Sequence, residues 1–143
     1  MKKLNKLILQ DNDYSCGPIA LANLLTLSGI SINIPDIHRK MRTSNRPGEE
    51  GTTSDDFIKC MSLFGDVVFF KSRNQLPKQF IIEYKTGRDY HFALILKSEN
   101  RWKIINHWFK NKFYLEYNIT LSELRRILDH KETFCYYLRK RKK

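Results

Sequence analysis

The spacing of apolar residues along the chain changes character near its middle. In the first half apolar residues recur at helical spacing, which predicts three helices. The first two lie at residues 16–28 and 33–41, and the third opens at residues 53–56 and ends just before Gly65. The first is apolar almost all round, with Pro18 in its first turn and Gly29 as its stop, so we expect a buried central helix. Ser54 can cap the third helix, and two acidic residues favour its positive end.

The second half consists of short runs of β-branched and aromatic residues, which predict strands. These runs lie at residues 67–70, 80–83, 92–96, 102–105, 113–117 and 134–138. A helix at 120–130 interrupts them, and Thr120 with Glu123 has the spacing of a capping box. Helices first and strands later imply an α+β fold, in which the central helix packs on a C-terminal antiparallel sheet.

The charge of the chain is concentrated at its ends. The 143 residues fit one domain, and the formal net charge is +11. That charge alone suggests an acidic partner, which could be nucleic acid, an anionic membrane surface or an acidic protein. However, residues 7–138 hold 18 basic residues against 15 acidic ones. We therefore predict one domain at residues 1–138 whose body, residues 7–138, is nearly balanced in charge. A basic tail follows at 139–143 and could steer the protein to an anionic partner.

Composition excludes several classes of protein. Hydrophobic residues make up 41% of the chain, too many for a disordered protein. No apolar run approaches the ~20 residues that span a bilayer, and Leu7–Leu9 is too short for the core of a signal peptide. The three cysteines are an odd number without zinc-finger spacing. We expect a cytoplasmic protein with reduced thiols and with neither a metal nor an organic cofactor.

Cys16 lies at the predicted N-terminus of the central helix. Backbone N–H groups and the helix dipole favour a negative charge there, which predicts a thiol pKa below its usual value. Gln10, six residues upstream, is placed to stabilise an oxyanion together with the Cys16 N–H. The alternatives are a small buried thiol at a helix start and a solvated loop glutamine. Cys60 and Cys135 lie in the middle of predicted elements, and we expect them to be core thiols.

His91 begins a strand that turns near Ser98 and returns to Asn106. A turn centred between residues 98 and 99 places His91 directly opposite Asn106, and a turn one residue later makes them diagonal neighbours on one face. Either register lets Asn106 orient an imidazole that deprotonates Cys16. A shift of the turn centre by half a residue would put His91 and Asn106 on opposite faces of the hairpin. The alternative interpretation of His91 is a strand-end histidine that is hydrogen-bonded to the backbone. By strand alternation His107 points to the opposite face, as a structural or surface residue.

The order and spacing of these residues resemble the bacteriocin-processing, double-glycine leader peptidases. The matching positions are Gln10, Asp13, Cys16, Gly17, Ala20, Leu21, Ala22, Gly29, Arg42, residues 51–54, Phe57, Leu63, Gly65, residues 91–96 and Asn106. The family consists of papain-like cysteine peptidases, often found as N-terminal domains of peptide-exporting transporters. The resemblance implies a papain-like fold, a peptide or protein substrate, and a site made of the nucleophile Cys16, the base His91, the orienting residue Asn106 and the oxyanion donor Gln10.

The sequence departs from the family pattern at two places. The family usually has Asp followed by Pro where this chain has Asn106 and His107, and Asn supports an imidazolium less than Asp does. The proline at position 18, after Cys16 and Gly17, is more typical of the wider papain-like group. The resemblance therefore supports the class of reaction better than it supports a double-glycine leader as the substrate. The leading prediction is a cysteine peptidase that acts through an acyl-enzyme. The alternatives are a weak or inactive papain-like binding or regulatory module and a basic nucleic-acid-binding domain.

Overall fold

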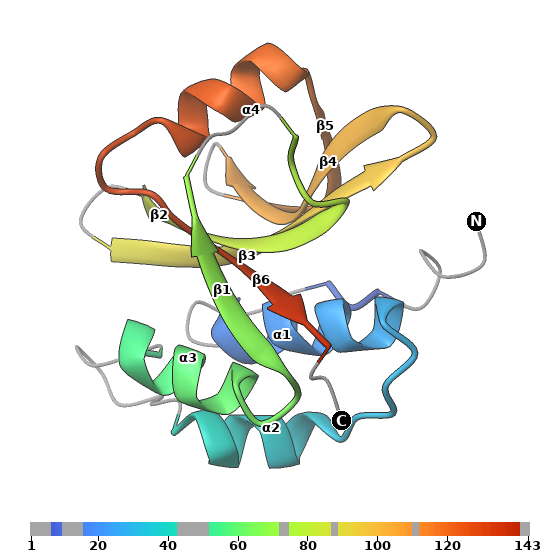
Figure 1. Ribbon diagram of the computed structural model, residues 1–143, viewed down its shortest axis with the longest axis vertical. Helices are drawn as coiled ribbons and strands as arrows, with labels where there is room; N and C mark the ends of the chain where they lie inside the picture. Colours follow the sequence, from blue (N-terminus) through green and yellow to red (C-terminus); the bar gives the residue numbers. More distant parts are fainter. Residues whose placement is uncertain are drawn as a thin grey trace.

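The computed structural model describes residues 7–9, 16–42, 52–71, 75–86, 89–109 and 112–140. Their helices and strands are, in chain order, α1 (Cys16–Leu27), α2 (Ile34–Met41), α3 (Ser54–Met61), β1 (Asp66–Phe70), β2 (Gln79–Thr86), β3 (Asp89–Ser98), β4 (Arg101–Phe109), β5 (Lys112–Ile119), α4 (Leu121–Leu128) and β6 (Phe134–Arg139). Helices α1, α2 and α3 cover one face of the sheet, and α4 covers the other (Figure 1). The predicted α+β class is confirmed.

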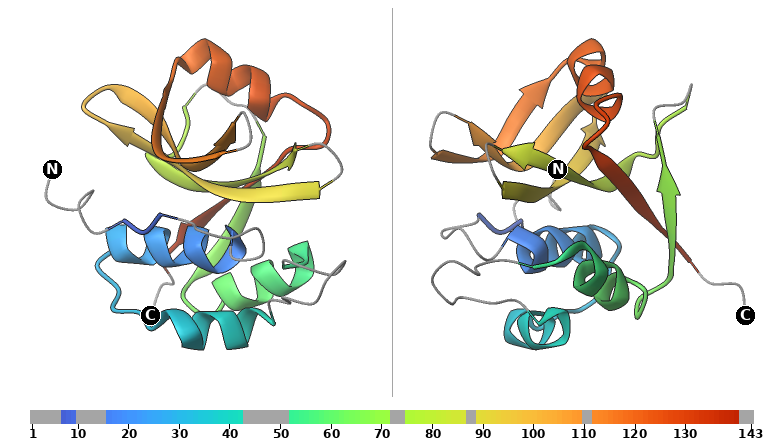
Figure 2. Two further views of the ribbon diagram at one scale, coloured as in Figure 1. Left: turned by 180° about the vertical axis from the view of Figure 1, so that it is seen from behind. Right: turned by 90° about the vertical axis from the view of Figure 1, so that its left-hand side faces the viewer.

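The sheet is antiparallel throughout its six strands. Its order is β1-β6-β2-β3-β4-β5, so β6 enters between the strand that follows α3 and the hairpin β2–β3. Each predicted strand is present, and the observed strands extend beyond the predicted bounds. The side view in Figure 2 shows the helical layer of α1, α2 and α3 on one side of the sheet. Within the described residues, no helix is long and apolar enough to cross a membrane.

Helix ends follow the sequence signals with one exception. Gly29 has a φ of 78° just after α1, which is the left-handed conformation that a glycine stop provides. The capping box of Thr120 and Glu123 is present at α4. At α3, however, the N-cap is Thr53 rather than Ser54, because the Thr53 side chain accepts the Asp56 N–H. The Ser54 hydroxyl instead donates to the buried Glu83 carboxylate at 2.6 Å.

Two apolar clusters fill the two faces of the sheet. The cluster beneath α1, α2 and α3 includes Cys16, Phe57 and Phe92, and the rings of Phe57 and Phe92 stack with centroids 4.3 Å apart. The cluster beneath α4 includes Cys135 on β6. Cys60 and Cys135 are both buried free thiols, as predicted for core residues. Because α1 lies against β3, the start of α1 is held at the strand that carries His91.

Candidate active site

Cys16 is the first residue of α1, and its side chain is only 5% exposed. The N–H of Phe92 on β3 donates a hydrogen bond to the thiol, and the N–H groups of Cys16 and Gly17 at the helix start add to it. The sulfur therefore lies beside the peptide group that joins His91 to Phe92. Packing of α1 on β3 thus brings the predicted nucleophile to the backbone of the predicted base.

The thiol is a weak acid in this setting. Burial raises the pKa of Cys16 to about 11, and the three N–H donors lower that pKa only in part. The carboxylate of Glu83, on the neighbouring strand, raises it slightly further. The predicted lowering of the thiol pKa is therefore wrong, because the loss of water around a buried sulfur outweighs the helix N-terminus.

Gly17 allows close packing at the start of α1. A Cβ atom at this position would lie 2.8 Å from Thr52 Oγ1 and 3.0 Å from Met41 Sδ. These contacts come from the end of α2 and the segment just before α3. The space beside Gly17 is thus filled by the protein itself.

We expect Gly17→Ala to lower the free energy of unfolding by about 1 kcal/mol in chemical denaturation. Alanine gains about 1 kcal/mol of helix propensity, but overpacking a rigid site costs about 1–3 kcal/mol, so the clash prevails. The matched control is the double variant Gly17→Ala with Thr52→Ala, which removes the contacting hydroxyl and should cost less than the sum of the single changes. A stabilised Gly17→Ala variant would contradict this packing.

His91 is buried to the same extent as Cys16, with 5% of its side chain exposed. Its Nε2 lies 2.8 Å from the main-chain carbonyl oxygen of Asn106. A carbonyl only accepts, so Nε2 carries the hydrogen and Nδ1 is the basic nitrogen of the neutral ring. Burial lowers the pKa of His91 to about 4, an effect that the Asn106 carbonyl opposes and the nearby His107 reinforces. At pH 7 both Cys16 and His91 are therefore neutral.

Asn106 contacts His91 through its backbone. The β3–β4 ladder pairs Leu94 with Ile105, which is the second of the two predicted registers, and Asn106 follows with a φ of 61°. Asparagine tolerates this left-handed conformation better than most residues do. Its side-chain Nδ2 donates to the Ile8 carbonyl at 2.7 Å. The expectation that the side chain of Asn106 orients the imidazole is thus corrected, because the observed contact uses the main-chain carbonyl.

The N-terminal segment is anchored beside this site. The amide of Asn23, fully buried on α1, accepts the Ile8 N–H at 2.8 Å and donates to the Ile8 carbonyl at 3.1 Å. Ile8 is therefore held between α1 and Asn106 on β4. Gln10 follows two residues later and lies outside the described residues, so its predicted role remains a prediction.

Solved peptidase domains share this arrangement of elements. The peptidase domain of Streptococcus ComA, a bi-functional ABC transporter, matches with a TM-score of 0.69 and 18% identity over 95% of this chain and 98% of that chain. A double glycine motif protease from an AMS/PCAT transporter, in complex with the leader peptide, matches with a TM-score of 0.64 and 15% identity. The match covers 93% of this chain and 91% of that chain. The chain has the double-glycine peptidase fold. No protein-family model and no curated protein matches it.

In this double-glycine peptidase fold, aromatic residues surround the His91 ring. Tyr84 lies directly opposite His91 on β2, with ring centroids 5.5 Å apart, and Phe113 lies at the same distance. The Tyr84 hydroxyl is 2.9 Å from His107 Nδ1. His107 thus packs with Tyr84 beside the His91 ring, whereas the side chain of its neighbour Asn106 bonds to Ile8 on the α1 side. The two neighbours point to opposite faces, as strand alternation predicts.

Among the described residues, Cys16 is thus linked to His91 through the peptide group between His91 and Phe92, whereas the His91 ring packs on Tyr84 and Phe113. Among the described residues no hydrogen bond joins the thiol to the imidazole. Those residues also contain no group of three or more His, Cys, Asp or Glu side chains that could hold a metal ion.

Sequence reasoning missed three residues that support this site. Asn23 was the one with a usable signal, because an amide within an apolar helix needs a buried partner. Tyr84 and His107 carried no such signal, since their contact joins strands β2 and β4, which are not adjacent in the sheet. Asn23 holds the segment that leads to Gln10, Tyr84 packs on His91, and His107 contacts Tyr84.

Proposed function

We propose that the protein is a cysteine peptidase that cleaves a peptide or protein substrate through an acyl-enzyme. The observation that carries this proposal is the position of the Cys16 sulfur, at a helix start and against the peptide group of His91. The double-glycine peptidase fold supports it, and so does the leader peptide bound by one similar structure. The proposed roles of Cys16, His91 and Gln10 are those that the resemblance in sequence implies.

In the proposed reaction Cys16 attacks the substrate carbonyl and forms the sulfur–carbon bond. The thiol proton passes to Nδ1 of His91, which then gives it to the leaving amine as the peptide C–N bond breaks. The Asn106 carbonyl holds the Nε2–H throughout, and this keeps the ring in the required tautomer. Water then attacks the thioester, with His91 acting as its base, and releases the acid product and the free thiol.

The resting pair in this mechanism is neutral. With a pKa of about 11 for Cys16 and about 4 for His91, the thiol keeps its proton until the substrate is attacked. His91 then acts as a general base during bond formation rather than as the partner of a preformed thiolate.

We therefore expect iodoacetamide to alkylate Cys16 slowly at pH 7, with a rate that rises about tenfold per pH unit between pH 7 and 10. The reason is that only the thiolate reacts and the pKa of Cys16 lies near 11. Peptide mapping by mass spectrometry follows the modification of Cys16 in the intact fold. A rate that is flat from pH 5 to pH 8 would instead show a preformed thiolate–imidazolium pair.

Gln10 is proposed as the oxyanion donor, together with the backbone at Cys16. The anchoring of Ile8 to Asn23 and Asn106 supports this role, because it fixes the chain two residues before Gln10. We expect Gln10→Ala to lower kcat by about 10²-fold while KM stays within a factor of about 3, since the bond forms only in the transition state. An unchanged kcat would remove Gln10 from the mechanism.

A non-catalytic peptide-binding module is the second candidate. It is favoured by the raised pKa of the thiol and by the burial of Cys16 and His91. The two candidates share the peptide ligand and differ in whether the peptide bond is broken.

The distinguishing experiment incubates the protein with a peptide mixture that includes a double-glycine peptide and identifies new termini by mass spectrometry. The peptidase predicts new termini that disappear in the Cys16→Ser variant, which has nearly the same shape. Peptides that bind equally to both proteins and stay intact would establish the binding module. Cleavage that survives in Cys16→Ser would exclude Cys16 as the nucleophile.

A further inference from the structure

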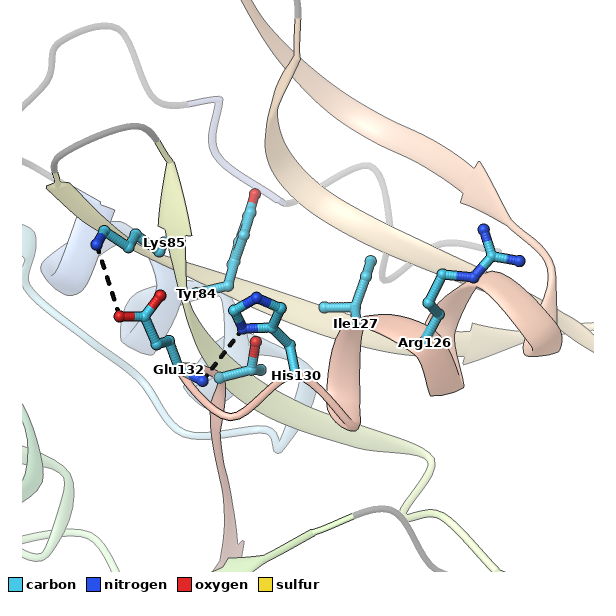
Figure 3. Close-up of a pocket in the computed structure, with 7 residues that line it drawn as sticks. Tyr84, Lys85, Arg126, Ile127, His130 and Glu132 are labelled. Carbon is cyan, nitrogen blue, oxygen red and sulfur yellow. Dashed lines mark hydrogen bonds and ion pairs between the residues drawn. The ribbon is translucent and has the colours of Figure 1, made fainter.

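A cavity lies on the face of the sheet opposite α1, between β2 and α4 (Figure 3). Its volume is about 450 Å³. Tyr84 and Lys85 come from β2, Arg126 and Ile127 from α4, and His130 and Glu132 from the turn after α4. The proposed peptidase mechanism uses none of these residues as a nucleophile, base or oxyanion donor.

The charges around this cavity favour an anionic ligand. Glu132 pairs with Lys85 at 3.6 Å, so its charge is largely balanced. Arg126 is exposed, and among the described residues no side-chain hydrogen bond or ion pair holds its guanidinium. Glu123, one turn earlier on α4, lies close enough to feel that charge, but its carboxylate is held by the Thr120 hydroxyl at 2.8 Å.

The cavity also has an apolar wall. Tyr84 and Ile127 lie between Lys85 and Arg126 in the row of side chains seen in Figure 3. Tyr84 belongs to the apolar cluster beneath α4, and the partly buried Ile127 packs against that cluster. A ligand that fits this lining combines one negative group with a small apolar body.

We propose that this cavity binds an organic carboxylate, with the carboxylate on the Arg126 guanidinium and the apolar body against Tyr84 and Ile127. Arginine is suited to this because its planar fork donates two parallel hydrogen bonds to a carboxylate. Free aromatic carboxylates and the C-terminal residue of a peptide share this chemistry.

The ligand would contact a residue that packs on His91. Tyr84 is the cross-strand partner of His91, and its hydroxyl meets His107 Nδ1 at 2.9 Å. A ligand resting on Tyr84 therefore perturbs the surroundings of the His91 ring. We expect its binding to shift the His91 imidazole resonance in the NMR spectrum.

The test titrates three probes into the Cys16→Ala protein, so that its result does not depend on peptidase activity. The probes are 3-phenylpropionate, N-acetylphenylalanine and N-acetylphenylalaninamide, followed by NMR shifts of residues at the cavity. The proposal expects at least one acid to bind about tenfold more tightly than the amide. Binding of 3-phenylpropionate alone identifies a free carboxylate, and binding of N-acetylphenylalanine as well identifies a peptide C-terminus. Equal affinity for the amide, or no binding of either acid, overturns the proposal.

Three variants locate the site. Arg126→Gln should weaken binding of the acid about tenfold, and Glu132→Gln should strengthen it by removing a nearby negative charge. Arg125→Gln is the matched control, because it removes the same charge from the adjacent position, which does not line the cavity. Circular dichroism confirms that each variant folds. An equal loss of affinity for the acid in Arg125→Gln and Arg126→Gln would show that only the net charge matters, and would overturn the proposed site.

Discussion

Replacing Cys16 with alanine is expected to lower kcat/KM for peptide cleavage by about 10⁴-fold or more, to the background of the assay. No other described group is placed to form the covalent bond, because the thiol is the side chain that meets the His91 peptide group. His91→Ala should cause a similar loss. Without the imidazole, a thiol with a pKa of about 11 has no base to accept its proton at pH 7.

The double variant, with both Cys16 and His91 replaced by alanine, should be no worse than either single variant. Residues that act as one unit lose their function together, so their effects do not add. Cys60→Ala and Cys135→Ala are the matched controls, since both remove a buried thiol without touching the site. Initial rates measured by chromatography check all five proteins. Activity that persists in Cys16→Ala and vanishes in Cys60→Ala would transfer the nucleophile to another thiol.

Acid should destabilise the fold through His91. The buried imidazole has a pKa of about 4 in the folded chain against about 6.5 when unfolded, so between these values the unfolded chain binds the extra proton. Stability is therefore fully present above pH 6.5 and is lost as pH falls toward 4. The full difference is about 3 kcal/mol in the free energy of unfolding, at about 1.4 kcal/mol per pH unit.

Urea denaturation at several pH values measures this loss, and the His91→Gln variant isolates it from other groups. The variant should lose much less stability between pH 6.5 and pH 4, whatever its stability at pH 7. His130→Gln is the matched control, because it makes the same substitution at an exposed histidine. Parallel curves for the wild-type and His91→Gln proteins would show that His91 is charged in the fold.

The fold could be predicted because its signals are local. The apolar helix at α1, the capping box at Thr120 and the runs of β-branched residues each specify their element without reference to the rest of the chain. The β3–β4 register was limited to two possibilities by the length of the turn, and one of them is observed. Only the choice between Ser54 and Thr53 as the cap of α3 was wrong, because Glu83 takes the Ser54 hydroxyl from a distant strand.

The chemistry of the site was harder to predict because it depends on burial and on one backbone angle. The helix N-terminus at Cys16 is a local feature, whereas the burial that raises the thiol pKa comes from packing against β3. Similarly, the side chain of Asn106 is drawn to Ile8, nearly a hundred residues away in sequence, and leaves the main-chain carbonyl for His91. Long-range contacts of this kind leave no pattern in a single sequence.

The most direct test of the central claim is to look for the acyl group on Cys16. An intact peptide that the protein cleaves is mixed with it, and the reaction is quenched with acid within seconds. The intact mass of the protein and its peptide map are then recorded. The proposed mechanism predicts a mass increase equal to the N-terminal product less one water, located on Cys16 and missing from His91→Ala. Substrate cleavage with no adduct on Cys16, or with the adduct on Cys60 or Cys135, would contradict it.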